Sequence, residues 1–145
     1  MSGSDFSTDA DGRLRGSGIH DAVVREFHFA DSGEFNLRMR GTDGEDRLVA
    51  LRGVARLGMR DLINGTIISD IYCWKLDQGD LEGYAVDAAW RAIVADAFRE
   101  PELPQLAARL AQEHADCYLV YFESSYGGEI AAVCREVRGP RVVQV

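Results

Sequence analysis

The clearest pattern in the chain is an alternation of apolar and polar side chains in its first third. In the stretch Phe35–Arg40 (FNLRMR) every second side chain is apolar, which is the period of a strand that buries one face. The preceding residues 31–33 (DSG) fit a three-residue hairpin loop with its glycine in the left-handed conformation. A five-residue loop over 41–45 leads into a further strand that includes Leu51. The pattern therefore predicts a three-stranded antiparallel meander.

The two loop lengths also predict which residues face each other across this meander. One face becomes apolar, and the other brings opposite charges together. A shift of either register by one residue would mix the two faces. Two arginines, Arg25 and Arg47, fall on the apolar side near its end. The expected apolar-face pairs are Phe29–Phe35, Phe27–Leu37, Arg25–Met39, Leu37–Val49 and Phe35–Leu51, and the expected outer pairs are Glu26–Arg38, His28–Asn36, Arg40–Asp46 and Glu34–Arg52.

After the meander the sequence predicts further strands and two helices. Residues 66–74 are rich in β-branched and aromatic side chains and predict a strand. Its alternation places Ile68, Asp70, Tyr72 and Trp74 on one face. Apolar residues spaced three and four apart predict the helices. The expected segments are a helical turn over 57–63, helices over 84–99 and 103–114, and strands over 117–122, 130–137 and 142–145.

Strands and helices are grouped along the chain rather than alternating, which favours the α+β class with a mostly antiparallel sheet. The expected order is an N-terminal meander, two central helices and C-terminal hairpin strands. Residues 1–18 are small, polar and rich in glycine, serine and aspartate, so we expect a flexible tail there. The length of 145 residues fits one domain, which we assign to residues 19–145.

The three cysteines are an odd number and have no metal-type spacing. They predict buried free thiols rather than disulfides or a zinc site, and we expect no metal and no cofactor. Whether two of them meet depends on the last hairpin turn. Pairing of Phe122 with Glu129 would place Cys117 opposite Cys134, whereas a tighter turn at Gly127-Gly128 would separate them.

The net charge of the chain argues against some classes of partner. Sixteen basic and 24 acidic residues give a net charge of −8, which argues against a protein that binds the nucleic-acid backbone. No apolar run approaches the ~20 residues of a membrane span. The N-terminus also lacks the apolar core of a signal peptide. We therefore expect a soluble, cytoplasmic protein without a nucleic-acid or membrane partner.

Most of the negative charge lies in the predicted helical segment. Residues 76–116 hold nine acidic and three basic side chains, a net charge of −6. An acidic surface of this kind steers a basic partner and raises its association rate. The first hypothesis is a non-enzymatic protein-binding module that recognises a basic protein. The residues assigned to that surface are Asp80, Glu82, Asp87 and Asp96.

The alternative hypothesis is a small enzyme or ligand-binding domain. Its site would lie near Asp70, Tyr72 and Trp74, where one carboxylate shares a strand face with two aromatic rings. No cysteine or serine lies in a pattern typical of an activated nucleophile, so we assign no catalytic residue and favour a non-enzymatic protein. A homo-oligomer formed through the terminal strand, residues 142–145, is compatible with either hypothesis.

Two stretches resemble known proteins. His20-Asp21 before the amphipathic strand, followed by the Leu37, Leu51 and Gly53-Val54 pattern, resembles small uncharacterised bacterial β-rich proteins. The run from Tyr121 to Glu129 (YFESSYGGE), with the AAV sequence after it, is similar to a strand–turn–strand of small acidic immunity proteins of bacterial toxin systems. This resemblance implies a cytosolic protein that neutralises a toxin by binding it, without catalysis. It carries over no individual binding residue.

Overall fold

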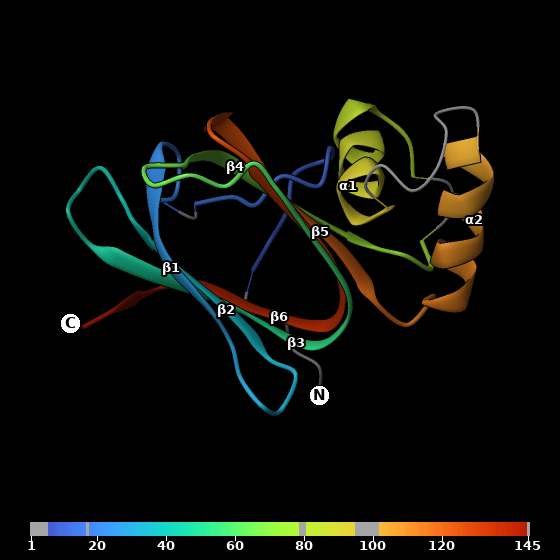
Figure 1. Cartoon of the computed structure of the whole chain (residues 1–145), viewed down its shortest axis with the longest axis horizontal. Coiled ribbons are helices and arrows are strands. Elements are labelled where there is room, and N and C mark those ends of the chain that lie inside the picture. The colour runs from blue at the N-terminus through green and yellow to red at the C-terminus, as the bar shows by residue number, and fades with distance from the viewer. Residues whose placement is uncertain (1–5, 17, 79–80, 95–101, 145) are drawn as a thin grey trace.

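Six antiparallel strands close into a barrel, and two helices cover part of its outer surface (Figure 1). The computed structural model describes residues 6–16, 18–78, 81–94 and 102–144. Around the barrel the strand order is β1-β2-β3-β6-β5-β4, and the pairing of β4 with β1 closes the ring. The α+β class and the antiparallel sheet are confirmed, but the closure of the sheet is a finding of the structure. The elements are β1 (Ala22–Phe29), β2 (Phe35–Arg40), β3 (Asp46–Arg60), β4 (Ile67–Lys75), α1 (Tyr84–Val94), α2 (Leu103–Glu113), β5 (Tyr118–Tyr126) and β6 (Glu129–Val143).

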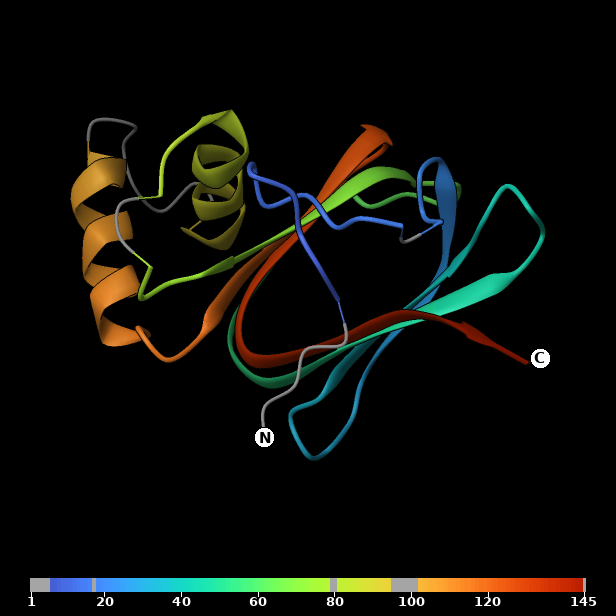
Figure 2. The same cartoon turned by 180° about the vertical axis from the view of Figure 1, so that it is seen from behind.

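The two longest strands, β3 and β6, are neighbours in the barrel. They pair from Asp46–Val143 to Arg60–Glu129 and bend together (Figure 2). Register shifts after Leu48 and Val54 interrupt the pairing and allow this bend. The helical turn expected over 57–63 is therefore wrong. The two expected strands over 130–137 and 142–145 are one strand, because pairing with β3 continues across Gly139-Pro140; Val145 lies outside the described residues.

The predicted meander is confirmed in nearly every pair. Phe29 faces Phe35, Leu37 faces Val49, and the Arg52 guanidinium lies 3.1 Å from the Glu34 carboxylate. The exception is Arg25, which we expected opposite Met39. A register shift between Val24 and Glu26 gives that position to Val24 instead, so the bulge removes the charged side chain from the apolar face.

The register of the last hairpin is neither of the two that we expected: it differs by one residue from the pairing of Phe122 with Glu129, and it is not a tight turn at Gly127-Gly128. Phe122 pairs with Ile130, so Cys134 lies opposite Tyr118 rather than opposite Cys117. All three cysteines are buried free thiols, as predicted. The helices are confirmed within the described residues: α1 covers 84–94 of the expected 84–99, and α2 ends at Glu113. Residues 95–99 of the first expected helix lie outside the described part of the chain.

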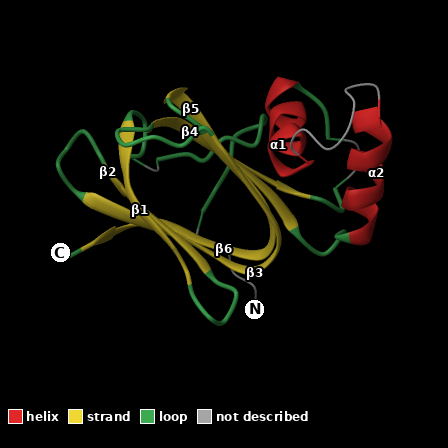
Figure 3. Cartoon of the chain, viewed as in Figure 1, coloured by secondary structure: helices red, strands yellow, loops and turns green. Residues whose placement is uncertain are grey.

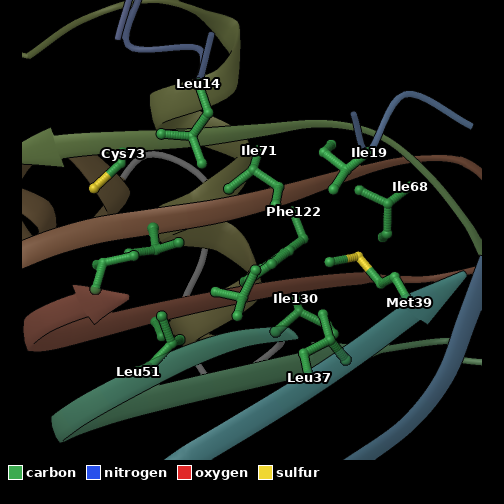
Figure 4. Close-up of a cluster of buried hydrophobic side chains, with 14 of the residues drawn as sticks. Leu14, Ile19, Leu37, Met39, Leu51, Ile68, Ile71, Cys73, Phe122 and Ile130 are labelled. Atoms are coloured by element: carbon green, nitrogen blue, oxygen red, sulfur yellow. The ribbon is translucent and has the colours of Figure 1, made fainter. Parts of the chain in front are cut away.

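The buried apolar side chains form two layers. The first fills the barrel and includes Leu37, Leu51, Ile71 and Phe122 (Figure 4). The second lies between the outer face of β4, β5 and β6 and the two helices, which stand on one side of the barrel (Figure 3). The strands in this region are covered on both faces, which explains their nearly continuous apolar sequence.

The segment that we expected to be a flexible tail contributes to the barrel over its described residues, 6–16 and 18. The amide of Leu14 donates to the carbonyl of Ile71 (2.8 Å), and the amide of Cys73 donates to the carbonyl of Gly12 (2.8 Å). These bonds cover the edge of β4 beyond its short pairing with β1. Leu14 and Ile19 are buried in the barrel interior (Figure 4). Residues 1–5 and 17 of the expected tail lie outside the described residues.

Candidate functional site

Two hollows lie on either side of the start of α1 and share Leu81 and Val86 in their walls. The smaller, about 360 Å³, lies between the N-terminal segment, β4 and α1. We call it the tyrosine pocket, and its walls include Asp11, Arg13, Tyr72, Trp74, Glu82 and Tyr84. The larger, about 640 Å³, lies between α1 and α2. We call it the helix groove, and its walls include Leu76, Asp77, Asp87, Trp90, Leu103 and Ala108.

Tyr72 and Trp74 form the floor of the tyrosine pocket. Their rings meet edge to face with centroids 5.4 Å apart, on the outer face of β4. Only 2 % of Tyr72 and 9 % of Trp74 is exposed, because the N-terminal segment and α1 cover this face. The expected grouping of Ile68 with these residues is wrong. A register shift between Ile68 and Asp70 turns Ile68 into the barrel core.

A chain of hydrogen bonds crosses this floor. The Arg13 guanidinium donates from Nη2 to the Tyr72 hydroxyl (2.8 Å), whose oxygen lies 3.0 Å from the hydroxyl of Tyr84. Tyr84 is in turn hydrogen-bonded to the carboxylate of Glu123, and these two bonds raise its pKa. The Tyr84 hydroxyl is therefore neutral at physiological pH, and the hydrogen-bonding capacity of both hydroxyls is largely used within the protein.

Among the described residues around the tyrosine pocket, acidic groups outnumber basic groups. Arg13 lies between two carboxylates, with Nε 3.4 Å from Asp70 and Nη1 3.9 Å from Asp9. Burial raises the pKa of Asp70, and the Arg13 charge opposes that effect. The indole N–H of Trp74 donates to the backbone carbonyl of Asp11 (3.0 Å). The carboxylates of Asp11 and Glu82 thus add negative charge to the walls, where Arg13 is the guanidinium among the described lining residues and is already paired with carboxylates.

The helix groove combines an apolar interior with an acidic rim. Trp90 on α1 and Leu103 on α2 contribute to its buried floor, and three alanines of α2 line it without filling it. Asp77 and Asp87 are exposed at the groove, and Arg91 is the basic residue among the described lining. The described residues between 76 and 116 hold six acidic and two basic side chains, so the surroundings are acidic as well.

The structure separates the residues assigned from the sequence. Glu82 and Asp87 are exposed, and each lies at a different hollow. Asp80 and Asp96, the other two residues of the expected acidic surface, lie outside the described residues. Asp70, Tyr72 and Trp74 do share the outer face of β4, although Asp70 is not among the residues that line the tyrosine pocket.

Sequence reasoning missed Arg13 and Tyr84, which complete the polar chain with Tyr72. Arg13 lies in a segment whose composition is typical of a disordered tail. The available signals were Phe6 and Leu14, the two isolated apolar residues of that segment: the barrel buries Leu14, and Phe6 packs against the same cluster. Tyr84 gave no signal, because its partner Tyr72 lies twelve residues away on a different element.

Comparisons of the chain with protein-family models, curated proteins and solved structures gave no match. Within the described ranges, no helix has the length and apolar character needed to cross a lipid bilayer. The evidence for function therefore lies in the geometry of the two hollows.

Proposed function

We propose that this protein is a non-enzymatic binding protein that holds a basic, amphipathic helical segment of a partner protein in the helix groove. One observation carries the proposal: an apolar groove of about 640 Å³ lies open between two helices and is rimmed by carboxylates. Recognition of an amphipathic helix uses this chemistry, because the partner's apolar face enters the groove while its charged face meets the rim.

The two parts of the groove have different roles in this proposal. Contacts with Trp90, Leu103 and the α2 alanines would bury apolar surface and provide affinity. Asp77 and Asp87 would attract a basic partner and accelerate its encounter with the groove. A small acidic immunity protein, the class that the sequence resembles, would act on a basic toxin in this way.

The test uses a defined peptide and the fluorescence of Trp90. The chain has two tryptophans, so the Trp74→Phe protein reports from Trp90 alone, which lines the groove. The probe is a peptide of about 16 residues with leucines on one helical face and lysines on the other. We expect saturable binding that weakens as salt is added, and no binding of a peptide with glutamate in place of lysine. Equal binding of the two peptides, or no binding of the lysine peptide, would contradict the proposal.

Three variants localise the binding. Ala108→Phe fills the groove from an exposed position of α2 and should abolish binding. Asp87→Asn should reduce the association rate at low salt and have little effect at high salt. Glu45→Gln removes the same charge from an exposed turn between β2 and β3 and serves as the matched control. If Glu45→Gln weakens binding as much as Asp87→Asn does, the loss of binding results from the change in net charge and not from the position of the charge at the groove.

A second candidate function is the binding of a small organic cation in the tyrosine pocket. The observation that favours it is that Arg13 is already paired with Asp9 and Asp70, whereas the carboxylates of Asp11 and Glu82, beside aromatic rings, have no ion pair within the described residues. Carboxylates and aromatic faces together attract alkylated ammonium groups. An anion would instead have to compete with two carboxylates for the Arg13 guanidinium.

Choline and its uncharged isostere 3,3-dimethylbutanol test this second candidate. In the Trp90→Phe protein, the remaining Trp74 reports from the pocket floor. We expect a saturable fluorescence change with choline, reduced by Glu82→Gln, and none with the isostere. Tyr84→Leu should also weaken binding, since it removes an exposed aromatic ring, and Tyr84→Phe should retain it. An equal response to the two compounds would exclude charge recognition at this pocket.

A further inference from the structure

The second half of β1 has a free edge. β1 pairs with β4 only at Ala22 and Val23, and the last bond on that side joins the Val24 amide to the Thr66 carbonyl (2.9 Å). In the part of the chain that the structure describes, no strand lies beside residues 25–29 on this side. Figure 1 shows the β1–β2 hairpin projecting from the barrel away from α1 and α2.

The hairpin bond from the Ala30 amide to the Glu34 carbonyl (2.8 Å) defines which backbone groups point to the free edge. Backbone direction alternates along an antiparallel strand, so His28 and Glu26 bond to β2. The amides and carbonyls of Phe27 and Phe29 therefore point outward. These backbone groups can form the hydrogen bonds of a further antiparallel strand.

On the inner face of the barrel, the side chains beside this edge are aromatic. Phe27 is 49 % exposed and Phe29 is 51 % exposed, and both rings lie next to the buried Phe35, at 6.2 and 5.3 Å between centroids. They continue the inner face of the barrel beyond its closed part. An open edge with exposed aromatic side chains is the kind of surface that soluble proteins normally protect.

The contrasting edge is that of β6 after Cys134, where pairing with β5 ends. It carries Pro140, Arg138 and the exposed Arg141, which are typical protecting residues of an edge strand. The edge of β1 also carries the exposed polar residues Arg25, Glu26 and His28, but it has no proline, and its two phenylalanines lie where pairing would bury them. This difference favours the pairing of the β1 edge with another strand.

We propose that a second copy of this chain pairs with the free edge, β1 against β1, in antiparallel orientation about Phe27. In this arrangement Phe27 faces Phe27 of the partner subunit, and all four phenylalanines of the two strands gather on one face. On the opposite face Glu26 lies across from His28 of the partner subunit, and the same contact repeats through the two-fold axis. This pairing is independent of the proposed function, because neither hollow includes a residue of β1.

Charge complementarity selects this register and this partner. Glu26 and His28 are exposed and have the spacing that lets the strand complement itself. Pairing about His28 instead would place the two imidazoles opposite each other and leave Glu26 without a basic partner across the edge. The strand thus carries both the acidic and the basic residue of this contact, so two copies of the chain can form it without any other protein.

Cysteine cross-linking tests the register directly. Residues that face each other in a hydrogen-bonded antiparallel pair have Cα atoms about 5.5 Å apart, within the range of a disulfide. Under mild oxidation Phe27→Cys should therefore form a covalent dimer, whereas His28→Cys should stay monomeric. The native cysteines are buried and provide a low background. Cross-linking of His28→Cys but not of Phe27→Cys would overturn the register.

Sedimentation of the unlabelled full chain provides the second measurement. We expect a monomer–dimer equilibrium that depends on concentration. His28→Glu places like charges opposite each other twice and should raise the dissociation constant roughly 2- to 30-fold, while His28→Lys should lower it. Glu45→Gln is the control and should leave the dissociation constant unchanged. A chain that is monomeric at every concentration, with no cross-link through Phe27→Cys, would overturn the proposal.

Discussion

Gly58 on β3 and Ala92 on α1 approach each other without room for a side chain. A Cβ atom added to Gly58 would lie 1.9 Å from the backbone carbonyl oxygen of Ala92. A backbone atom cannot turn away as a flexible side chain would, so this glycine determines how closely α1 packs on the barrel. Because α1 forms a wall of both hollows, the contact also controls their shape.

Gly58→Ala should push α1 away from the barrel. We expect a loss of about 1–3 kcal/mol in the free energy of unfolding, typical of added volume at a packed contact. Urea unfolding followed by circular dichroism measures the loss, and Trp90 emission reports the displacement of α1. Arg56→Ala, at an exposed position of the same strand, is the control and should change stability by less than about 0.5 kcal/mol. Equal losses in the two variants would contradict the tight contact.

Gly12→Ala should loosen the N-terminal segment from β4. Gly12 has a φ of +88°, and an added Cβ would lie 2.2 Å from Nε1 of Trp74. We expect a cost of about 1–3 kcal/mol in the free energy of unfolding and a red shift of Trp74 emission in a Trp90→Phe background. Gly44→Ala is the matched control, since it has a similar φ of +82° and open space around it. If Gly44→Ala lowers the free energy of unfolding more than Gly12→Ala does, the loss reflects backbone strain at a positive φ and not the contact with Trp74.

Asp46 should make the stability depend on pH in the acid range. Its buried carboxylate accepts a hydrogen bond from Nε of Arg40 (2.8 Å), and this bond lowers its pKa below the ordinary 3.8. The stabilisation is therefore complete above that ordinary value and is lost as the pH falls through the lowered pKa of the folded state. The urea midpoint of the wild type should therefore decline as the pH falls below about 4, more steeply than that of Asp46→Asn. Asp31→Asn, in an exposed turn, should retain the wild-type pH profile.

The three thiols should be unreactive in the folded protein. Burial raises the pKa of Cys73 and Cys117, and it raises that of Cys134 to about 12. Because the thiolate is the reactive form, Ellman's reagent should modify none of them in native buffer and all three in urea. Ser125→Cys places a thiol at an exposed position and should react quickly in the folded state. Rapid native modification without this substitution would show that the regions burying the native cysteines open readily.

The sequence by itself determined the meander and the two helices. The pairs Phe29–Phe35 and Leu37–Val49 follow from two loop lengths and one period of apolar residues, all within about thirty residues of each other. The local pattern failed at Arg25, where a bulge restores an apolar side chain to the inner face. A bulge leaves no signal in the period, so only the structure could place it.

The candidate sites divide in the same way. The aromatic residues Tyr72 and Trp74 could be singled out because they share a strand face with Asp70 in the sequence pattern. The groove between α1 and α2 could not, because it depends on how far apart two helices stand on the barrel. The acidic character of that region was visible from composition, whereas the apolar interior beside it was not.

Tertiary structure alone decided the closure of the barrel and the contacts that complete each site. Arg13 reaches Tyr72 across 59 positions in the sequence, and β3 continues to Arg60, where a helical turn was expected, because β6 pairs with it. Local periodicity records which face of an element is apolar, but it does not record which distant element covers that face. That choice depends on the apolar surface buried and the backbone hydrogen bonds formed by the whole chain at once, and these terms exist only in the folded molecule.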